Sequence, residues 1–320
     1  MVNTMNNKIA GHRFLAFGLA VSLTVTGITG CTVEQADTAG SEEAAQSTAK
    51  EQVLKGHNEN EASNLGAWGR AMGAVLISIN DGSPYYFGGY DTTDANAKAA
   101  KSILRSSWNI SNRKQLLKQI DVLYNTGSRT DYKREAHDLN KMSKAQRKKA
   151  LKQVSGDLKT HYDNLQYIWD TWGNKGLLAW DLCRISHLAQ WGYIADYINL
   201  DEAQAVLEPA ALRLQKKFDN WDDVVINWLD GYAYASSVPI RSVEETDYTS
   251  RKNVYEKLVA DQKESDPLFD DNLFHTEIIP LGTITYDSLM DEIKPKKTAR
   301  TKAVIKKKKQ QGKDSEEVTQ

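Results

Sequence analysis

Asp181 and Arg184 are the residues of this sequence whose types and spacing could best do chemistry. A carboxylate and a guanidinium three residues apart on a helix share one face and can pair. Trp180 and Trp191 add flat aromatic surface beside them, as the wall of a ligand cleft would. These four are our candidate binding residues, and no catalytic residue is assigned. The pair could equally be a buried ion pair that only fixes how its helix packs.

Cys183 and His187 lie four residues apart on the same expected helix. A thiolate nucleophile needs such a His partner, whereas most cysteines in apolar helices only pack. We expect Cys183 to be a buried free thiol, with a catalytic pair as the alternative. Asp230, just before Gly231, could join a charged cluster with Asp181.

Motifs for metal or cofactor binding are missing from the sequence. The six histidines show no metal-ligand spacing, and there is no Cys-x-x-Cys, phosphate-binding glycine loop or Gly-x-Ser-x-Gly. We expect no metal and no cofactor. An enzyme is not excluded, because glycosidase carboxylates need no local signature.

Two further segments are alternatives for binding. Residues 84–90 hold three tyrosines and a phenylalanine, which could bind sugar or a partner or could form a lid over the core. Residues 141–152 hold six basic residues and no acidic one. That pattern is most often a solvated helix face and less often a binding patch.

The start of the chain predicts a lipid anchor. Lys8 and Arg13 precede an apolar run over residues 14–28, which is too short to span a bilayer and typical of a signal peptide. The run ends in Ile-Thr-Gly-Cys at residues 28–31, which resembles the bacterial lipobox. The resemblance implies cleavage before Cys31 and acylation of that residue, palmitate included. An ordinary signal peptide with a chance cysteine is the alternative.

The sequence predicts five regions. Residues 1–30 are the lipoprotein signal peptide, and residues 31–63 are the lipidated cysteine with an acidic, disordered stalk. Residues 64–240 form a helical domain, on which residues 241–293 pack as a C-terminal extension. Residues 294–320 carry ten basic and three acidic residues and are expected to be a disordered tail.

Helical periodicity dominates the body, and no proline occurs between Pro84 and Pro209. We predict an all-α, multi-helix globular domain, with a minor β-hairpin near Pro280 and Gly282 as an open addition. Pro209 is expected to kink or split its helix. Expected helices, with their start signals, cover residues 65–76, 94–108, 111–124 (capped by Ser111), 143–152 (Ser143 with Gln146), 157–172, 177–197, 199–214 (Asn199 with Glu202), 220–229 (Asn220) and 254–259.

Composition supports a folded domain and excludes several classes. Forty per cent of the chain is apolar, which suffices for a core, and the formal net charge of −1 gives no reason to expect a nucleic-acid binder. Two cysteines cannot build a disulfide framework.

Tryptophan, glycine and charged residues occur together at fixed spacing through the body. They include Trp68, Gly69, Arg70, Trp108, Gly127, Gly176, Trp180, Asp181, Arg184, Leu188, Trp191, Gly192, Tyr197, Glu202, Phe218, Trp221 and Gly231. This pattern resembles a bacterial family known as domain of unknown function 1266. The resemblance covers residues 64–240 and implies a mainly helical domain without a known activity. The region past about Val243 lies outside it.

These observations together predict a membrane-anchored, extracytoplasmic helical binding or interaction protein. Its partners are expected to be the membrane, through the lipid anchor, and an envelope protein or polymer, without nucleic acid. The location is the bacterial cell membrane, or the outer membrane where the host has one. The alternative is an envelope enzyme, such as a hydrolase, with its site around Asp181 and Arg184.

Overall fold

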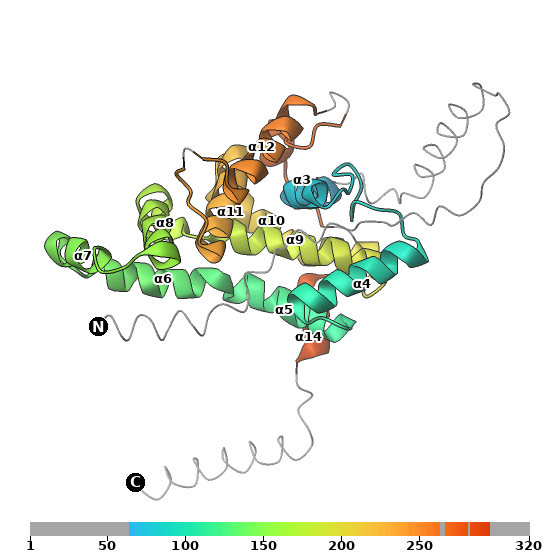
Figure 1. The fold of residues 1–320 in the computed structure, drawn as a ribbon. Helices are drawn as coiled ribbons and strands as arrows, with labels where there is room; N and C mark the ends of the chain where they lie inside the picture. Colours follow the sequence, from blue (N-terminus) through green and yellow to red (C-terminus); the bar gives the residue numbers. More distant parts are fainter. Residues whose placement is uncertain (1–63, 243, 263–265, 281, 295–320) are drawn as a thin grey trace, which may run out of the picture.

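The computed structural model describes residues 64–242, 244–262, 266–280 and 282–294 (Figure 1). The predicted signal peptide, Cys31, the stalk and residues 295–320 of the predicted tail lie outside this range. The helices are α3 (Asn64–Ile79), α4 (Asp94–Trp108), α5 (Arg113–Asn125), α6 (Gly127–Asn140), α7 (Lys144–Leu151), α8 (Gly156–Trp172), α9 (Leu178–Ile194), α10 (Leu200–Lys217), α11 (Trp221–Ser236), α12 (Asp247–Ala260), α13 (Asp271–His275) and α14 (Tyr286–Ile293), with a short 3₁₀ turn, η2 (Gly173–Lys175), before α9.

Helix α9 is the centre of the fold. It is apolar on almost every side, and all of its residues except Tyr193 are buried. A helix that is apolar all round must be covered by neighbours, and α3, α4, α5, α6, α10 and α11 all contact it (Figure 1). The expected helix over residues 177–197 is therefore present, but it ends at Ile194 because Asp196 adopts a φ of +57°.

Most predicted helix starts are confirmed. Ser143 and Asn199 each form a reciprocal capping box with the residue three positions on, and Asn220 accepts from the backbone N–H of Asp223. The cap predicted at Ser111 is wrong, because Asn112 caps α5 by accepting from the Gln115 N–H. Ser111 instead donates its own N–H to the Gln115 side chain at 2.7 Å.

The all-α prediction is confirmed, and the minor β-hairpin is wrong, since the residues that the structure describes contain no β-strand. Thr285 forms a capping box with Ser288 and starts α14, where the second strand was expected. Thr276 ends α13, and its carbonyl accepts from the Gln215 amide at 2.8 Å. Pro209 does not split its helix, because α10 continues on both sides of it.

The aromatic segment at residues 84–90 is a loop on the core. Phe87 is buried and meets the Tyr193 ring edge-on, with the centroids 5.9 Å apart. The Gly88 N–H donates to the Gln190 side chain at 2.9 Å, which fastens the loop to α9. These contacts favour the lid over the sugar-binding alternative.

Helices α12, α13 and α14 pack on the domain from the region expected to be a C-terminal extension. Helix α12 contacts α3 and α11, while α14 contacts α5 and α10. Arg113 on α5 joins the two parts through ion pairs to Glu202 at 2.7 Å and to Glu292 at 2.8 Å. Within the described residues no helix is long and apolar enough to cross a membrane.

Candidate functional site

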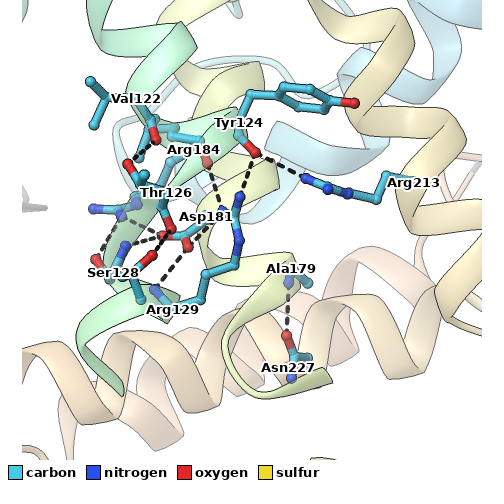
Figure 2. Close-up of polar contacts among 12 residues, drawn as sticks. Val122, Tyr124, Thr126, Ser128, Arg129, Ala179, Asp181, Arg184, Arg213 and Asn227 are labelled. Atoms are coloured by element: carbon cyan, nitrogen blue, oxygen red, sulfur yellow. Dashed lines mark hydrogen bonds and ion pairs between the residues drawn. The ribbon is translucent and has the colours of Figure 1, made fainter. Parts of the chain in front are cut away.

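Asp181 is fully buried and its carboxylate is saturated with donors. One oxygen accepts from the Ser128 N–H at 2.8 Å and from Arg184 Nη2 at 2.8 Å. The other accepts from the Arg129 N–H at 3.0 Å and from Arg129 Nη1 at 2.9 Å (Figure 2). The ion pair that the sequence predicts between Asp181 and Arg184 is present, and Arg129 completes it as a second cation.

The backbone N–H groups of Ser128 and Arg129 show that the Asp181 carboxylate caps a helix. Ser128 and Arg129 are in the first turn of α6, where N–H groups have no partner within the helix. No side chain at the α6 N-cap position accepts from them. Asp181 supplies that cap from α9, and its negative charge also suits the positive end of the α6 dipole.

Gly127 makes room for this contact. Its φ of +57° is a left-handed conformation that favours glycine. A Cβ atom built there would lie 2.2–2.6 Å from the carboxylate atoms of Asp181. Gly127 therefore follows the end of α5 and lets the Asp181 carboxylate reach the start of α6.

Arg129 binds the opposite end of the preceding helix. Its guanidinium donates to the carbonyl of Leu123 at 2.6 Å and to that of Tyr124, both in the last turn of α5. Arg213 from α10 also donates to the Tyr124 carbonyl, at 2.9 Å (Figure 2). We call this set, Asp181 with Arg129 and the facing ends of α5 and α6, the α5–α6 junction. Its chemistry is structural, because every acceptor position of the carboxylate is occupied.

Arg184 extends from this junction onto a neighbouring face of α9. Its Nη2 also donates to the Ser128 hydroxyl at 2.9 Å. Its guanidinium carbon lies 4.5 Å from the Trp180 ring centroid and 5.5 Å from that of Trp108. These are the positions of cation–π contacts.

A row of large polar-tipped side chains continues along that face of α9. Trp180, Arg184, His187 and Trp191 follow at four-, three- and four-residue steps, which keeps them on one side of a helix. Trp228 from α11 packs against the row, with its ring centroid 6.2 Å from Trp180 and 6.0 Å from His187. We call these five residues the α9 aromatic face. It holds three of the four predicted binding residues, and Asp181 lies beside it.

Five nitrogens of the α9 aromatic face have no hydrogen-bond partner. The three indole Nε1 atoms, His187 Nε2 and Arg184 Nε are all buried and unpartnered. An unmet buried donor typically costs about 1–3 kcal/mol, and buried indole N–H groups usually find an acceptor. Burial, with Arg184 and Arg251 nearby, lowers the pKa of His187 to about 3, so the imidazole is neutral.

Cys183 and Asp230 stand apart from these groups. Burial raises the pKa of the Cys183 thiol, which keeps it protonated and favours packing over nucleophilic chemistry. Asp230 accepts from Trp172 Nε1 at 2.7 Å and from the Tyr248 hydroxyl at 3.0 Å, and these bonds do not link it to Asp181. Burial raises its pKa to about 6, although both hydrogen bonds oppose the shift.

One half-buried cluster has no signal in the sequence. Glu135 accepts from the Tyr234 hydroxyl at 2.9 Å, and the same oxygen lies 2.9 Å from His161 Nε2. Tyr132 packs edge-on against Tyr234, and its buried hydroxyl has no partner. These residues come from α6, α8 and α11, so no local spacing could join them.

The basic segment at residues 141–152 is an exposed surface. Its lysines are exposed, and α7 buries no residue. Arg147 is the half-buried exception and donates to Gln166 at 2.6 Å. No group of three or more His, Cys, Asp and Glu side chains in the described ranges is placed to hold a metal ion.

The family of the chain follows from a comparison with family models. The model described as protein of unknown function, DUF1266, matches residues 103–267, which are 165 of the 320 residues. The chain belongs to the DUF1266 family. The match runs from α4 through α12, so it begins later and ends later than the resemblance over residues 64–240. It includes the α5–α6 junction and the α9 aromatic face. No curated protein and no solved structure matches the chain.

Proposed function

We propose that this DUF1266 protein is a lipid-anchored binding protein that presents its helical domain outside the cytoplasm. The observation that carries the binding role is the α9 aromatic face, where five side chains bring together aromatic surface and unpartnered buried nitrogens. Ligand sites combine apolar walls with a few polar groups in this way.

The anchor in this proposal is Cys31. The apolar run and the Ile-Thr-Gly-Cys sequence at residues 28–31 support acylation of that cysteine. Several acyl chains on one residue hold a protein stably on a membrane, since each buried methylene contributes about 0.8 kcal/mol. The proposed location is the outer face of the bacterial cell membrane, or an outer membrane where the host has one. An envelope protein or polymer is the proposed partner class.

The alternative of an envelope enzyme centred on Asp181 and Arg184 has less support. A general acid or base must have a free position from which to exchange a proton with a substrate. The Asp181 carboxylate accepts four hydrogen bonds and is fully buried, so its contacts favour a structural role.

The anchor is tested by growing cells with a fatty-acid analogue and comparing the wild type with Cys31→Ala. We expect label and membrane attachment in the wild type and neither in the variant. Cys183→Ala is the matched control and should keep both. A Cys31→Ala protein that still carries label in the membrane would remove the anchor from the proposal.

The binding role is tested by capture from the envelope with the intact lipoprotein. Wild type should retain a partner that Trp191→Ala loses, provided that the variant remains folded by circular dichroism. Equal capture by both proteins would show that the α9 aromatic face is not the binding surface.

A further inference from the structure

The unpartnered nitrogens of the α9 aromatic face lack one kind of group. An indole N–H and an arginine Nε–H can only donate, and they account for four of the five atoms. Only His187 Nε2 changes role with its tautomer. What the face lacks is therefore a hydrogen-bond acceptor rather than another donor.

Two arginines lie beside this face. The two side chains whose charges act on His187 are Arg184 and Arg251, both cationic. Asp181 pairs with Arg184, and Arg129 shares the same carboxylate. A negative acceptor would supply the missing hydrogen-bond acceptor, and its charge suits a guanidinium donor.

The walls of this face are aromatic and nearly buried. Trp180, Trp191 and Trp228 are each 4–5% exposed, so only a small part of each residue meets solvent. The three indoles offer flat apolar area, which suits an apolar body carrying the acceptor. Because the nitrogens themselves are buried, a ligand would reach them only after a side chain of this face has moved.

We propose that the α9 aromatic face binds a small organic carboxylate with a flat apolar body. The carboxylate accepts hydrogen bonds from Arg184 and the Trp228 N–H, and its body lies against the tryptophan rings. This inference rests on the proposed binding role and names the ligand class for it.

The test uses the full-length protein and four probes. Benzoate has both the charge and the flat body, benzyl alcohol lacks the charge, acetate lacks the body, and inorganic phosphate is an anion of another shape. We expect benzoate to quench tryptophan fluorescence and, at ten times its Kd, to raise Tm by about 3–5 °C. The other three should bind at least about tenfold more weakly, since one lost hydrogen bond of this kind is worth that much.

A matched pair of variants places the binding at this face. Trp228→Phe removes an unpartnered N–H, whereas Trp221→Phe removes one that donates to the Asp270 carbonyl at 3.0 Å, and both rings are nearly buried. We expect Trp228→Phe to weaken benzoate binding about tenfold and Trp221→Phe to leave it unchanged. Without benzoate, Trp221→Phe should lower Tm more than Trp228→Phe does, because it removes a hydrogen bond that is satisfied in the folded protein.

Three results would overturn the proposal. They are no response to benzoate, an equal response to benzyl alcohol, and equal loss of benzoate binding in the two tryptophan variants. None of these results bears on the proposed lipid anchor, which the Cys31→Ala labelling experiment tests separately. Capture of an envelope partner that survives a failed benzoate titration would reject the ligand class and keep the binding role.

Discussion

The α5–α6 junction and the α9 aromatic face meet on helix α9, where Arg184 of the face pairs with Asp181 of the junction. At the junction a single carboxylate meets four donors within 3.0 Å, and each guanidinium around it also reaches a further acceptor. On the aromatic face five nitrogens are buried without a partner. Every hydrogen-bonding group of the junction carboxylate is thus satisfied, whereas the face leaves buried donors unmet.

Asp181→Asn is the substitution expected to break the junction most severely. It leaves Arg129 and Arg184 buried without a counter-charge, and removing one partner from a buried ion pair costs about 3–5 kcal/mol. Urea unfolding followed by circular dichroism measures the loss. The matched control is Asp163→Asn, whose exposed pair with Lys159 is worth at most about 1 kcal/mol. Equal stability of the two variants would show that the junction carries little of the fold.

Gly127→Ala tests whether space at the junction is needed as well as the left-handed backbone. The control is Gly156→Ala, because Gly156 has nearly the same φ, +55° against +57°, with nothing within 4 Å of its added Cβ. Backbone strain of about 1–2 kcal/mol is common to both variants. We expect Gly127→Ala to cost about 1–3 kcal/mol more, because its Cβ displaces the Asp181 carboxylate. Urea unfolding of the two variants gives the difference directly, and equal losses would exclude a steric requirement.

His187 provides a test of the aromatic face by pH. Its folded pKa of about 3 lies below the ordinary value of 6.5, so the unfolded chain binds more protons between these values. The free energy of unfolding should therefore fall as the pH is lowered, by about 2 kcal/mol at pH 5. His187→Phe should abolish this part of the slope between pH 7 and 5, whereas His275→Gln, at an exposed position, should not. A slope that His187→Phe does not change would mean that the imidazole is not sealed.

Asp230 is expected to give an effect of about the same size as His187, with the opposite sign. Its folded pKa of about 6 lies above the ordinary value, chiefly because of burial, so the folded chain binds more protons between about pH 4 and 6. Stability should therefore be lost as the pH rises through this range, by about 2 kcal/mol. Asp230→Asn should flatten that part of the curve, measured by urea unfolding at half-unit steps. A curve that steepens instead would contradict the shift.

Local signals predicted much of the fold. The caps at Ser143, Asn199 and Asn220 act over three residues, so the sequence displays them completely. Helix α6 was not predicted from the sequence, because its cap is Asp181, which lies 53 residues downstream of Ser128. The false hairpin near Pro280 has a different cause, since the cap of α14 is local but pairs Thr285 with a Ser at the third position rather than the usual Glu or Gln.

The parts of the candidate site that lie within α9 could likewise be predicted from the sequence. The Asp181–Arg184 pair spans three residues, and the face shared by Trp180, Arg184 and Trp191 follows from helical spacing. His187 fits that spacing too and could have been included. Arg129 and Trp228 come from other helices, 52 residues before Asp181 and 48 after Trp180, so only the fold brings them together.

The remote cap on α6 also bears on how the chain reaches its native state. A nascent chain that has emerged only as far as α8 contains every residue of α6 but not the carboxylate that stabilises its first turn. Helix α6 and the break before it therefore become stable only after α9 has been synthesised, and closing that loop of about fifty residues precedes the gain. One aspartate thus makes the folding of α6 depend on a contact between residues far apart in the sequence, in a protein most of whose other helices have caps from nearby residues.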